Sequence, residues 1–324
     1  MNVTTLPETM TALRVHALGE APRVDEIPVP PPQAGEVLVR LAATVIARHD
    51  LDVARGSLPV RQPLPYVPGL EGAGRVAAVG PDVDAARFPT GALVRASGGG
   101  LGVARAGTWA GYVAAPAAAV RPVPEGLDPV IAAACGSVAF TAWAALHDVG
   151  AVLPEERLGV TGASGAVGSL VLQLAERHGV ERVVAWVRSP ERLRALPPGA
   201  EVVTDGGPAE PVDVLIDTVG GPLLPERLGS VRPGGRAVLL GYTAGTRVCF
   251  ELPELMNRWV SLLPVNMQRH RLAAEIQERL VGDFAAGRLT VATDVVELPA
   301  LAEAIARFDA GRATGRVVLR WETA

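Results

Sequence analysis

The stretch Leu158–Gly179, LGVTGASGAVGSLVLQLAERHG, decides the fold class of this chain. Leu158–Thr161 predicts a short buried strand, and the residues that follow Gly168 place apolar side chains on one face of a helix. Between them lies a glycine-rich turn made of Gly162, Ala163, Ser164, Gly165, Ala166, Val167 and Gly168. A turn of this kind between a strand and a helix is typical of dinucleotide-binding sites.

The glycines of the turn fit the close contacts that such a site requires. Gly165 would let the backbone approach a pyrophosphate, and Gly168 would let the helix pack closely against the strand. The helix N-terminus would offer unpaired N–H groups and a partial positive charge to the phosphates. Ala163 stands where the usual fingerprint has its first glycine. A purely structural turn is the alternative, but the flanking strand and helix favour dinucleotide binding.

The end of the second strand predicts which dinucleotide is bound. NAD-binding proteins place an Asp or Glu about 20 residues after the turn, where it holds the ribose 2′-hydroxyl. Here that position is Arg188, and no carboxylate occurs before Glu191. Arg188, Ser189 and Arg192 would instead surround a 2′-phosphate, since arginine binds phosphate through two parallel hydrogen bonds. The alternative is a solvated arginine on a loop. We therefore expect NADPH.

Outward from this segment, strands alternate with helices from about residue 122. Predicted strands at Val183–Val187, Val214–Asp217 and Ala237–Leu240 and a predicted helix at Pro190–Ala195 indicate a parallel sheet with helical crossovers. The turn Pro233-Gly234-Gly235 is expected to precede the last of these strands. Val260–Val265 predicts an edge strand. Further elements are expected at three places: helices at Leu272–Ala286 and around Leu301–Phe308, and a final strand at Arg316–Trp321.

The first part of the chain has a different residue pattern, with short apolar runs separated by Gly and Pro. These runs predict the strands of an all-β unit, at Ala12–His16, Val37–Ala42, Gly74–Val79, Ala92–Ala96 and Tyr112–Ala115. Pro129–His147 is rich in alanine and predicts a helix. The fold class expected is therefore α/β, with a β domain and a doubly wound parallel sheet.

Composition excludes several classes of function. All 30 basic side chains are Arg, so Schiff-base chemistry and Walker-type phosphate binding, which both need Lys, are excluded. The net charge of -4 argues against nucleic acid as a partner. Two cysteines, Cys135 and Cys249, are too few for a four-Cys zinc lobe. No signal peptide is expected, because the N-terminus lacks a basic patch followed by an apolar core. No membrane span is expected, because no apolar run reaches about 18 residues. We expect a cytoplasmic protein.

Five segments together resemble the medium-chain dehydrogenase/reductase superfamily, and within it the quinone oxidoreductase (zeta-crystallin) branch. Besides the turn, they are PYVPGLEGAGRVAAVG at 65–80, FTAWAAL at 140–146, VDVLIDTVGG at 212–221, VRPGGRAVLLG at 231–241 and LPALAEAIARFDAGRATGRVVL at 298–319. The resemblance runs from Met10 to Trp321. It implies a GroES-like catalytic domain of residues 1–121 together with 287–324, and an inserted Rossmann NADPH-binding domain of residues 122–286. It also implies an active-site cleft at their junction.

The resemblance also suggests site residues and a zinc-free reaction. Thr141, Val219, Gly241 and Tyr242 fall where the family contacts the nicotinamide half of the cofactor. Zinc-dependent relatives have Cys and His at two positions where this chain has Ala47 and Leu70, and neither of these can bind a metal. Cys135 falls near a third ligand position but more simply packs as a small buried residue. We expect no metal.

Without zinc, the chain is expected to transfer a hydride from NADPH to a small electrophilic acceptor, a quinone or an α,β-unsaturated carbonyl compound. Such acceptors delocalise the developing charge and need less polarisation from the protein. Water, His49, Asp50 and Tyr66 are the candidates for the proton-donating group. Two alternatives stay open: an alcohol or enoyl-thioester oxidoreductase, and a non-enzymatic NADPH-binding protein. A homodimer through the Val260–Val265 edge is also expected.

Overall fold

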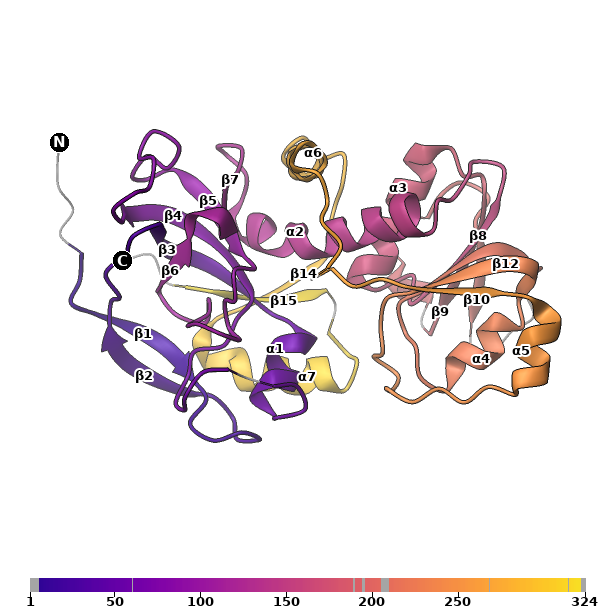
Figure 1. The fold of residues 1–324 in the computed structure, drawn as a ribbon, viewed down its shortest axis with the longest axis horizontal. Helices are drawn as coiled ribbons and strands as arrows, with labels where there is room; N and C mark the ends of the chain where they lie inside the picture. Colours follow the sequence, from indigo (N-terminus) through magenta and orange to yellow (C-terminus); the bar gives the residue numbers. More distant parts are fainter. Residues whose placement is uncertain are drawn as a thin grey trace. The chain divides into compact units, whose positions relative to one another are not determined.

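The computed structural model describes residues 6–59, 61–188, 190–193, 196–204, 210–267, 269–313 and 315–321. They form two compact units, Met1–Gly136 with Val281–Ala324, and Ser137–Leu280 (Figure 1). The sequence analysis placed the corresponding boundaries at 121/122 and 286/287. In the structure the first division falls inside helix α2 (Pro129–Trp143), whose first turns pack with the N-terminal unit.

The first unit is built on a seven-stranded sheet in the order β14-β15-β3-β4-β5-β7, with β6 paired to β3. Strands β1 and β2 pair antiparallel and form a separate two-stranded sheet. The strands are β1 (Thr9–Arg14), β2 (Arg23–Pro28), β3 (Glu36–Ile46), β4 (Glu71–Val79), β5 (Leu93–Ser97), β6 (Tyr112–Pro116), β7 (Val120–Pro122), β14 (Thr293–Val296) and β15 (Arg316–Arg320). Helices α1 (Arg48–Ala54) and α7 (Leu301–Asp309) complete the unit.

The C-terminal segment is part of this first sheet. Strand β15 pairs antiparallel with β3, with Val317 opposite Ile46 and Leu319 opposite Thr44. Val317, Leu319 and Trp321 are buried in the same core cluster as Val37 and Trp109. The two ends of the chain therefore share one hydrophobic core, which confirms the sequence-based expectation of a β domain made from both.

The second unit is a six-stranded, wholly parallel sheet in the order β10-β9-β8-β11-β12-β13. The strands are β8 (Arg157–Thr161), β9 (Arg182–Val187), β10 (Glu201–Thr204), β11 (Val212–Asp217), β12 (Val231–Leu239) and β13 (Ser261–Pro264). Helices α3 (Ala166–His178), α4 (Leu223–Leu228), α5 (Leu252–Arg258) and α6 (Ala274–Ala285) belong to the crossovers and the return of the chain. Every residue of the central strand β11 is buried, as expected for a strand covered on both faces.

Two expectations about local structure were wrong. Pro190–Arg192 forms a single 3₁₀ turn instead of a helix reaching Ala195, which lies outside the described residues together with Arg194. The turn at Pro233–Gly235 is absorbed into β12 beside an irregularity in its pairing with β11, because Gly234 takes a positive φ of 82°. Strands β2, β7, β10 and β14 were not predicted, since each is at most six residues long and contains charged residues.

One helical segment is long and apolar enough to cross a membrane, by length and composition alone. Pro129–Val149 comprises α2 and the π-helical segment Ala144–Val149 that continues it. In its most apolar window, 72% of the residues are buried inside the protein. The helical core of a globular protein has this burial, so the segment is weak evidence for membrane insertion. It nevertheless differs from the expectation that no apolar stretch would reach such a length.

Candidate functional site

The glycine-rich turn lies at the carboxyl end of β8 and leads into α3. Gly165 is the N-cap of α3 and is exposed, with no side chain capping the helix. A Cβ added at Gly165 would meet only the Gly162 carbonyl oxygen, at 3.1 Å. The first turn of α3 contains no acidic residue. An exposed, uncapped helix N-terminus with open backbone fits a phosphate group.

Two other glycines of the turn are fixed by packing. A Cβ at Gly168 would lie 2.3 Å from the Gly162 carbonyl oxygen, so only glycine allows α3 to approach the turn this closely. Gly162 has a φ of 59°, and a Cβ there would lie 2.4 Å from the Thr218 hydroxyl oxygen. Ala163 is fully buried. The turn therefore has the strand–turn–helix geometry that a dinucleotide pyrophosphate requires.

Asp217, the last residue of β11, connects this turn to the next loop. Its carboxylate accepts a hydrogen bond of 2.5 Å from the Thr161 hydroxyl and one of 2.7 Å from the Gly220 amide. Burial raises the pKa of Asp217 above its ordinary value, while the hydrogen bond from Thr161 opposes the shift. Sequence analysis missed Asp217 and Thr161. The signal available was the polar residue that ends each of two otherwise apolar strands.

Three of the four residues expected to contact a nicotinamide group, Val219, Gly241 and Tyr242, lie on the two loops that follow β11 and β12. The Ala244 amide donates to the Val219 carbonyl oxygen over 3.0 Å, which ties the loop after β12 to the loop after β11. A Cβ at Gly241 would lie 2.1 Å from the Thr218 carbonyl oxygen. Tyr242 follows and is 45% exposed. In α2, the Thr141 hydroxyl donates to the Ser137 carbonyl oxygen over 2.7 Å, a bond that leaves its lone pairs available.

At the end of β9, Arg188 is exposed at the carboxyl edge of the same sheet. Ser189 lies outside the described residues. Arg192 ends the short 3₁₀ turn, and the position of its side chain is likewise outside the described part. The first carboxylate after β9 is Glu191, within that turn. The described residues thus keep an arginine, and no acid, at the end of the second strand.

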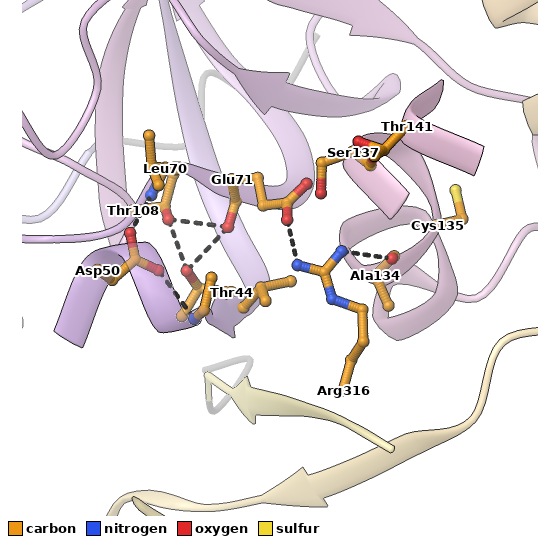
Figure 2. Close-up of polar contacts among 12 residues, drawn as sticks. Thr44, Asp50, Leu70, Glu71, Thr108, Ala134, Cys135, Ser137, Thr141 and Arg316 are labelled. Carbon is orange, nitrogen blue, oxygen red and sulfur yellow. Dashed lines mark hydrogen bonds and ion pairs between the residues drawn. The ribbon is translucent and has the colours of Figure 1, made fainter. Parts of the chain in front are cut away.

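The first unit holds a second polar cluster, centred on Asp50 (Figure 2). One Asp50 carboxylate oxygen accepts the Ala47 amide at 2.9 Å, and the other accepts the Leu70 amide at 3.1 Å. Asp50 lies in α1 and is only 2% exposed. Burial raises its pKa from 3.8 to about 7, although these two hydrogen bonds favour the charged form. The carboxyl group therefore changes its protonation near neutral pH.

Beside Asp50, two threonines and an ion pair hold the start of β4. The hydroxyls of Thr44 and Thr108 lie 3.1 and 2.9 Å from the Glu71 carbonyl oxygen and 2.6 Å from each other. Since each hydroxyl has one proton, one threonine donates to the carbonyl oxygen and the other donates to its neighbour's hydroxyl. The Glu71 carboxylate is paired with Arg316, which also donates to the Ala134 carbonyl oxygen at 2.9 Å (Figure 2). The sequence analysis singled out none of Thr44, Thr108 and Arg316 as site residues, because their contacts join segments far apart in the chain.

The other two proton-donor candidates have different environments. The Tyr66 hydroxyl and His49 Nδ1 are buried and have no hydrogen-bond partner among the described residues. Burial raises the pKa of Tyr66 to about 12 and lowers the pKa of His49. Tyr66 packs in a small cluster with Val15, Val53 and Ala54. Tyr66 would therefore stay protonated at neutral pH, and His49 would be mostly neutral.

The positions that correspond to zinc ligands do not fit a metal. Ala47 is the N-cap of α1 and Leu70 precedes β4, and neither side chain has a donor atom. Cys135 is buried, donates weakly to the Ala132 carbonyl oxygen over 3.7 Å, and has a pKa raised by burial to about 11. Among the described residues, no group of three or more His, Cys, Asp or Glu is placed to hold a metal ion. Cys135 and Cys249 are both free thiols.

Comparison with known proteins gives consistent matches. The family described as "Alcohol dehydrogenase GroES-like domain" matches residues 33–125, and the one described as "Zinc-binding dehydrogenase" matches residues 199–319. An alcohol dehydrogenase of Geobacillus stearothermophilus is 28% identical, over 96% of this chain and 99% of its own length. The quinone oxidoreductase of Mus musculus is 30% identical, over 72% of this chain and 73% of its own. The solved structure of a mycobacterial quinone oxidoreductase superposes with a TM-score of 0.79 at 26% identity, covering 96% of this chain and all of that one.

Proposed function

Because the chain belongs to the medium-chain dehydrogenase/reductase superfamily of oxidoreductases, we propose that it is an NADPH-dependent reductase that acts on a quinone or an α,β-unsaturated carbonyl compound without zinc. One observation carries the proposal: the nucleotide turn is intact, while Ala47 and Leu70 stand at would-be metal-ligand positions. An oxidoreductase that lacks a Lewis acid needs an acceptor that spreads the developing charge over its own conjugated bonds.

The nucleotide would be held at the carboxyl edge of the parallel sheet. The N-terminus of α3 and the backbone at Gly165 suit the pyrophosphate, and Arg188 suits a 2′-phosphate. Val219, Gly241 and Tyr242 would line the nicotinamide half, with Thr141 contributing from α2. When bound, the reduced nicotinamide supplies the hydride. The protein supplies orientation and excludes water.

For the proton, we propose His49 ahead of the other two side chains. Both oxygens of Asp50 already accept backbone N–H groups, so its carboxylate holds the entry to α1 and the start of β4 in place. The pKa of Tyr66, raised to about 12, makes proton release from its hydroxyl unfavourable near neutrality. His49 is the remaining side chain: burial lowers its pKa below the ordinary value, and its buried ring nitrogen Nδ1 has no partner among the described residues. Water is the alternative donor.

The relatives favour one second candidate. The full-length match to an enzyme named alcohol dehydrogenase supports an alcohol or aldehyde oxidoreductase, with an enoyl-thioester reductase as a further variant. A protein that binds NADPH without turnover is the remaining alternative. The same proposal includes a cytoplasmic location and a small electrophilic substrate.

We also propose that two copies pair through the β13 edge. Strand β13 is the last strand of its sheet, so its outer backbone groups have no strand partner among the described residues. Before it in sequence, Leu252 and Met256 of α5 and the helix C-cap Trp259 are 63%, 69% and 81% exposed. Pairing of two such edges about a twofold axis would satisfy the backbone and cover these apolar side chains.

The test is a turnover screen with purified protein. NADPH and NADH are each supplied with quinones, enones, enoyl thioesters, aldehydes and ketones, and oxidation of the cofactor is followed by absorbance. We expect oxidation of NADPH with a quinone or an enone and little with simple aldehydes and ketones. Preferential reduction of aldehydes or ketones would favour the alcohol dehydrogenase alternative. NADPH binding without oxidation by any acceptor would favour the non-enzymatic one.

A further inference from the structure

We infer that Asp217 is a positioning residue that joins the two halves of the parallel sheet and fixes the loop that would contact the nicotinamide half of the dinucleotide. The inference rests on the proposed nucleotide binding and goes beyond it, because it assigns a role to a residue that need not touch the ligand.

Asp217 lies at the carboxyl end of β11, in the middle of the parallel sheet. In the order β10-β9-β8-β11-β12-β13, the chain runs outward in one direction from β8 and in the other from β11. Ligands of doubly wound sheets bind over the carboxyl ends of the strands at this switch point. Thr161 ends β8, Asp217 ends β11, and the two are directly paired in the parallel register. Their side chains therefore meet at the switch point.

Four hydrogen bonds link the end of β8 to residues 217–220 at this switch point. The Thr161 hydroxyl donates to Asp217 Oδ1 over 2.5 Å and accepts from the Thr218 amide over 3.0 Å. The Thr218 hydroxyl donates to the Thr161 carbonyl oxygen over 2.8 Å, and the Gly220 amide donates to Asp217 Oδ2 over 2.7 Å. One carboxylate thus connects the strand that enters the nucleotide turn with residues 218–220 on the other half.

Residues 218–220 pack closely against the loop after β12, so the positions of the two loops depend on each other. A Cβ at Gly220 would lie 2.4 Å from the Gly241 carbonyl oxygen, so the loops after β11 and β12 are in direct backbone contact. The Leu240 amide donates to the Asp217 carbonyl oxygen over 2.9 Å. A shift of the Asp217 loop would therefore displace Gly241 and Tyr242 as well.

Because the Asp217 carboxylate is buried, it fixes the position of the segments that donate hydrogen bonds to it. Asp217 is 2% exposed, and burying a carboxyl group costs free energy unless it is hydrogen-bonded. Here one donor is at the end of β8 and the other is in the loop after β11, so the group is satisfied only when these two segments keep their relative position. The adenosine half of a dinucleotide lies over β8 and β9, and the other half over β11 and β12. Loss of the carboxylate should therefore weaken contacts with the nicotinamide half alone.

The experiment compares two probes by isothermal titration calorimetry on the full chain. NADPH reports on both halves of the site, and 2′,5′-ADP reports on the adenosine half alone. For Asp217→Asn, in which one side-chain oxygen is replaced by an NH2 group that cannot accept a hydrogen bond, we expect the Kd of NADPH to rise about ten-fold. The Kd of 2′,5′-ADP should stay close to that of wild type. Thr161→Val, which removes the donor, should give the same split.

Two controls separate positioning from general damage to the fold. Asp213 lies at the opposite end of β11, is 8% exposed and accepts the Arg157 amide at 2.7 Å, so Asp213→Asn removes a comparable buried charge far from the switch point. This variant should lower the thermal midpoint without separating the two Kd values. Thr161→Ser keeps a hydroxyl and should lie closer to wild type than Thr161→Val.

Equal weakening of both probes, or no weakening of either, in Asp217→Asn would overturn the inference. If that variant does not fold, Thr161→Val decides by the same criterion. Wild-type protein that binds neither probe would overturn the proposed nucleotide binding and this inference with it. Wild-type binding of both probes, followed by no split in the variants, would overturn this inference alone.

Discussion

Arg316 and Glu71 form a buried ion pair across 245 positions of the chain, with side chains that are only 8% and 5% exposed. Arg316 begins the last strand, and Glu71 begins β4 in the N-terminal part. The same guanidinium donates to the Ala134 carbonyl oxygen at the start of α2. The pair therefore holds together three segments of the first unit, and it supports the backbone next to Asp50 and Leu70.

Breaking this pair on one side should destabilise the protein strongly. Arg316→Leu removes the cation that is paired with the buried Glu71 carboxylate, and we expect a loss of about 3–5 kcal/mol in the free energy of unfolding. The double variant Glu71→Leu/Arg316→Leu should recover most of this loss, because neither charge then remains buried. Urea unfolding measures both. Arg23→Leu, which breaks an exposed pair with Glu20, is the control and should cost less than about 1 kcal/mol. A similar small cost for Arg316→Leu would contradict the prediction.

Asp50 should make stability fall as the pH rises. Its pKa is raised from 3.8 to about 7 in the folded state, so between these values the folded protein binds more protons than the unfolded one. Wild type should therefore lose up to about 1.4 kcal/mol per pH unit across this window relative to Asp50→Asn, which cannot ionise. Urea unfolding of both proteins at a series of pH values checks it. A stability difference that stays constant from acidic to neutral pH would show that Asp50 does not titrate in this range.

Arg188 should select NADPH over NADH. A hydrogen bond to a charged group contributes roughly 1.5–3 kcal/mol, which corresponds to a change in Kd of about ten-fold to a hundred-fold or more. Arg188→Ala should therefore weaken NADPH binding by about that factor and leave NADH binding nearly unchanged, because NADH has no 2′-phosphate. Fluorescence titration of both cofactors against both proteins measures the effect. Equal affinity of wild type for the two cofactors would refute the assignment.

Activity should not depend on zinc. Ala47 and Leu70 offer no donor atom, and Cys135 by itself cannot form the three-ligand site of a catalytic zinc. Elemental analysis of the purified protein should find far less than one zinc per chain, and prolonged treatment with EDTA should leave turnover unchanged. About one zinc per chain, with loss of turnover when it is removed, would overturn the prediction.

The exposed apolar side chains of α5 and of its C-cap Trp259 should lie in a dimer interface. Light scattering of wild type at micromolar concentration should give about twice the 33.6 kDa mass of one chain. Met256→Asp and Trp259→Asp should shift the mass to that of a monomer, since each places a charge among apolar groups that the partner would cover. Leu153→Asp, at a residue of unit two that is 50% exposed, should leave the mass unchanged. A monomeric wild type would exclude the proposed pairing.

The sequence by itself determined the features that depend on near neighbours in the chain. The strand, turn and helix of Leu158–Gly179 could be predicted because apolar periodicity and glycine spacing act over a few residues. The same holds for strands β1, β3, β4, β5, β6 and β15 of the N-terminal unit and for the absence of donor atoms at Ala47 and Leu70. Local signals were misleading at Pro190–Ala195 and at Pro233–Gly235, where the surrounding structure overrode the preference of the segment.

Only the tertiary structure decided which polar groups meet. Asp217 and Thr161 are 56 residues apart, and Thr44 and Thr108 are 64 apart, so no local pattern connects them. Parallel pairing of β8 with β11 creates the first contact, and the folding of β3 and β4 against the segment before β6 creates the second. The pKa of Asp50 was equally hidden, because the rise to about 7 comes from burial by residues distant in sequence. Spacing along the chain gives the kind of chemistry a segment can support, whereas burial and hydrogen bonding between distant segments set the protonation and position of each group.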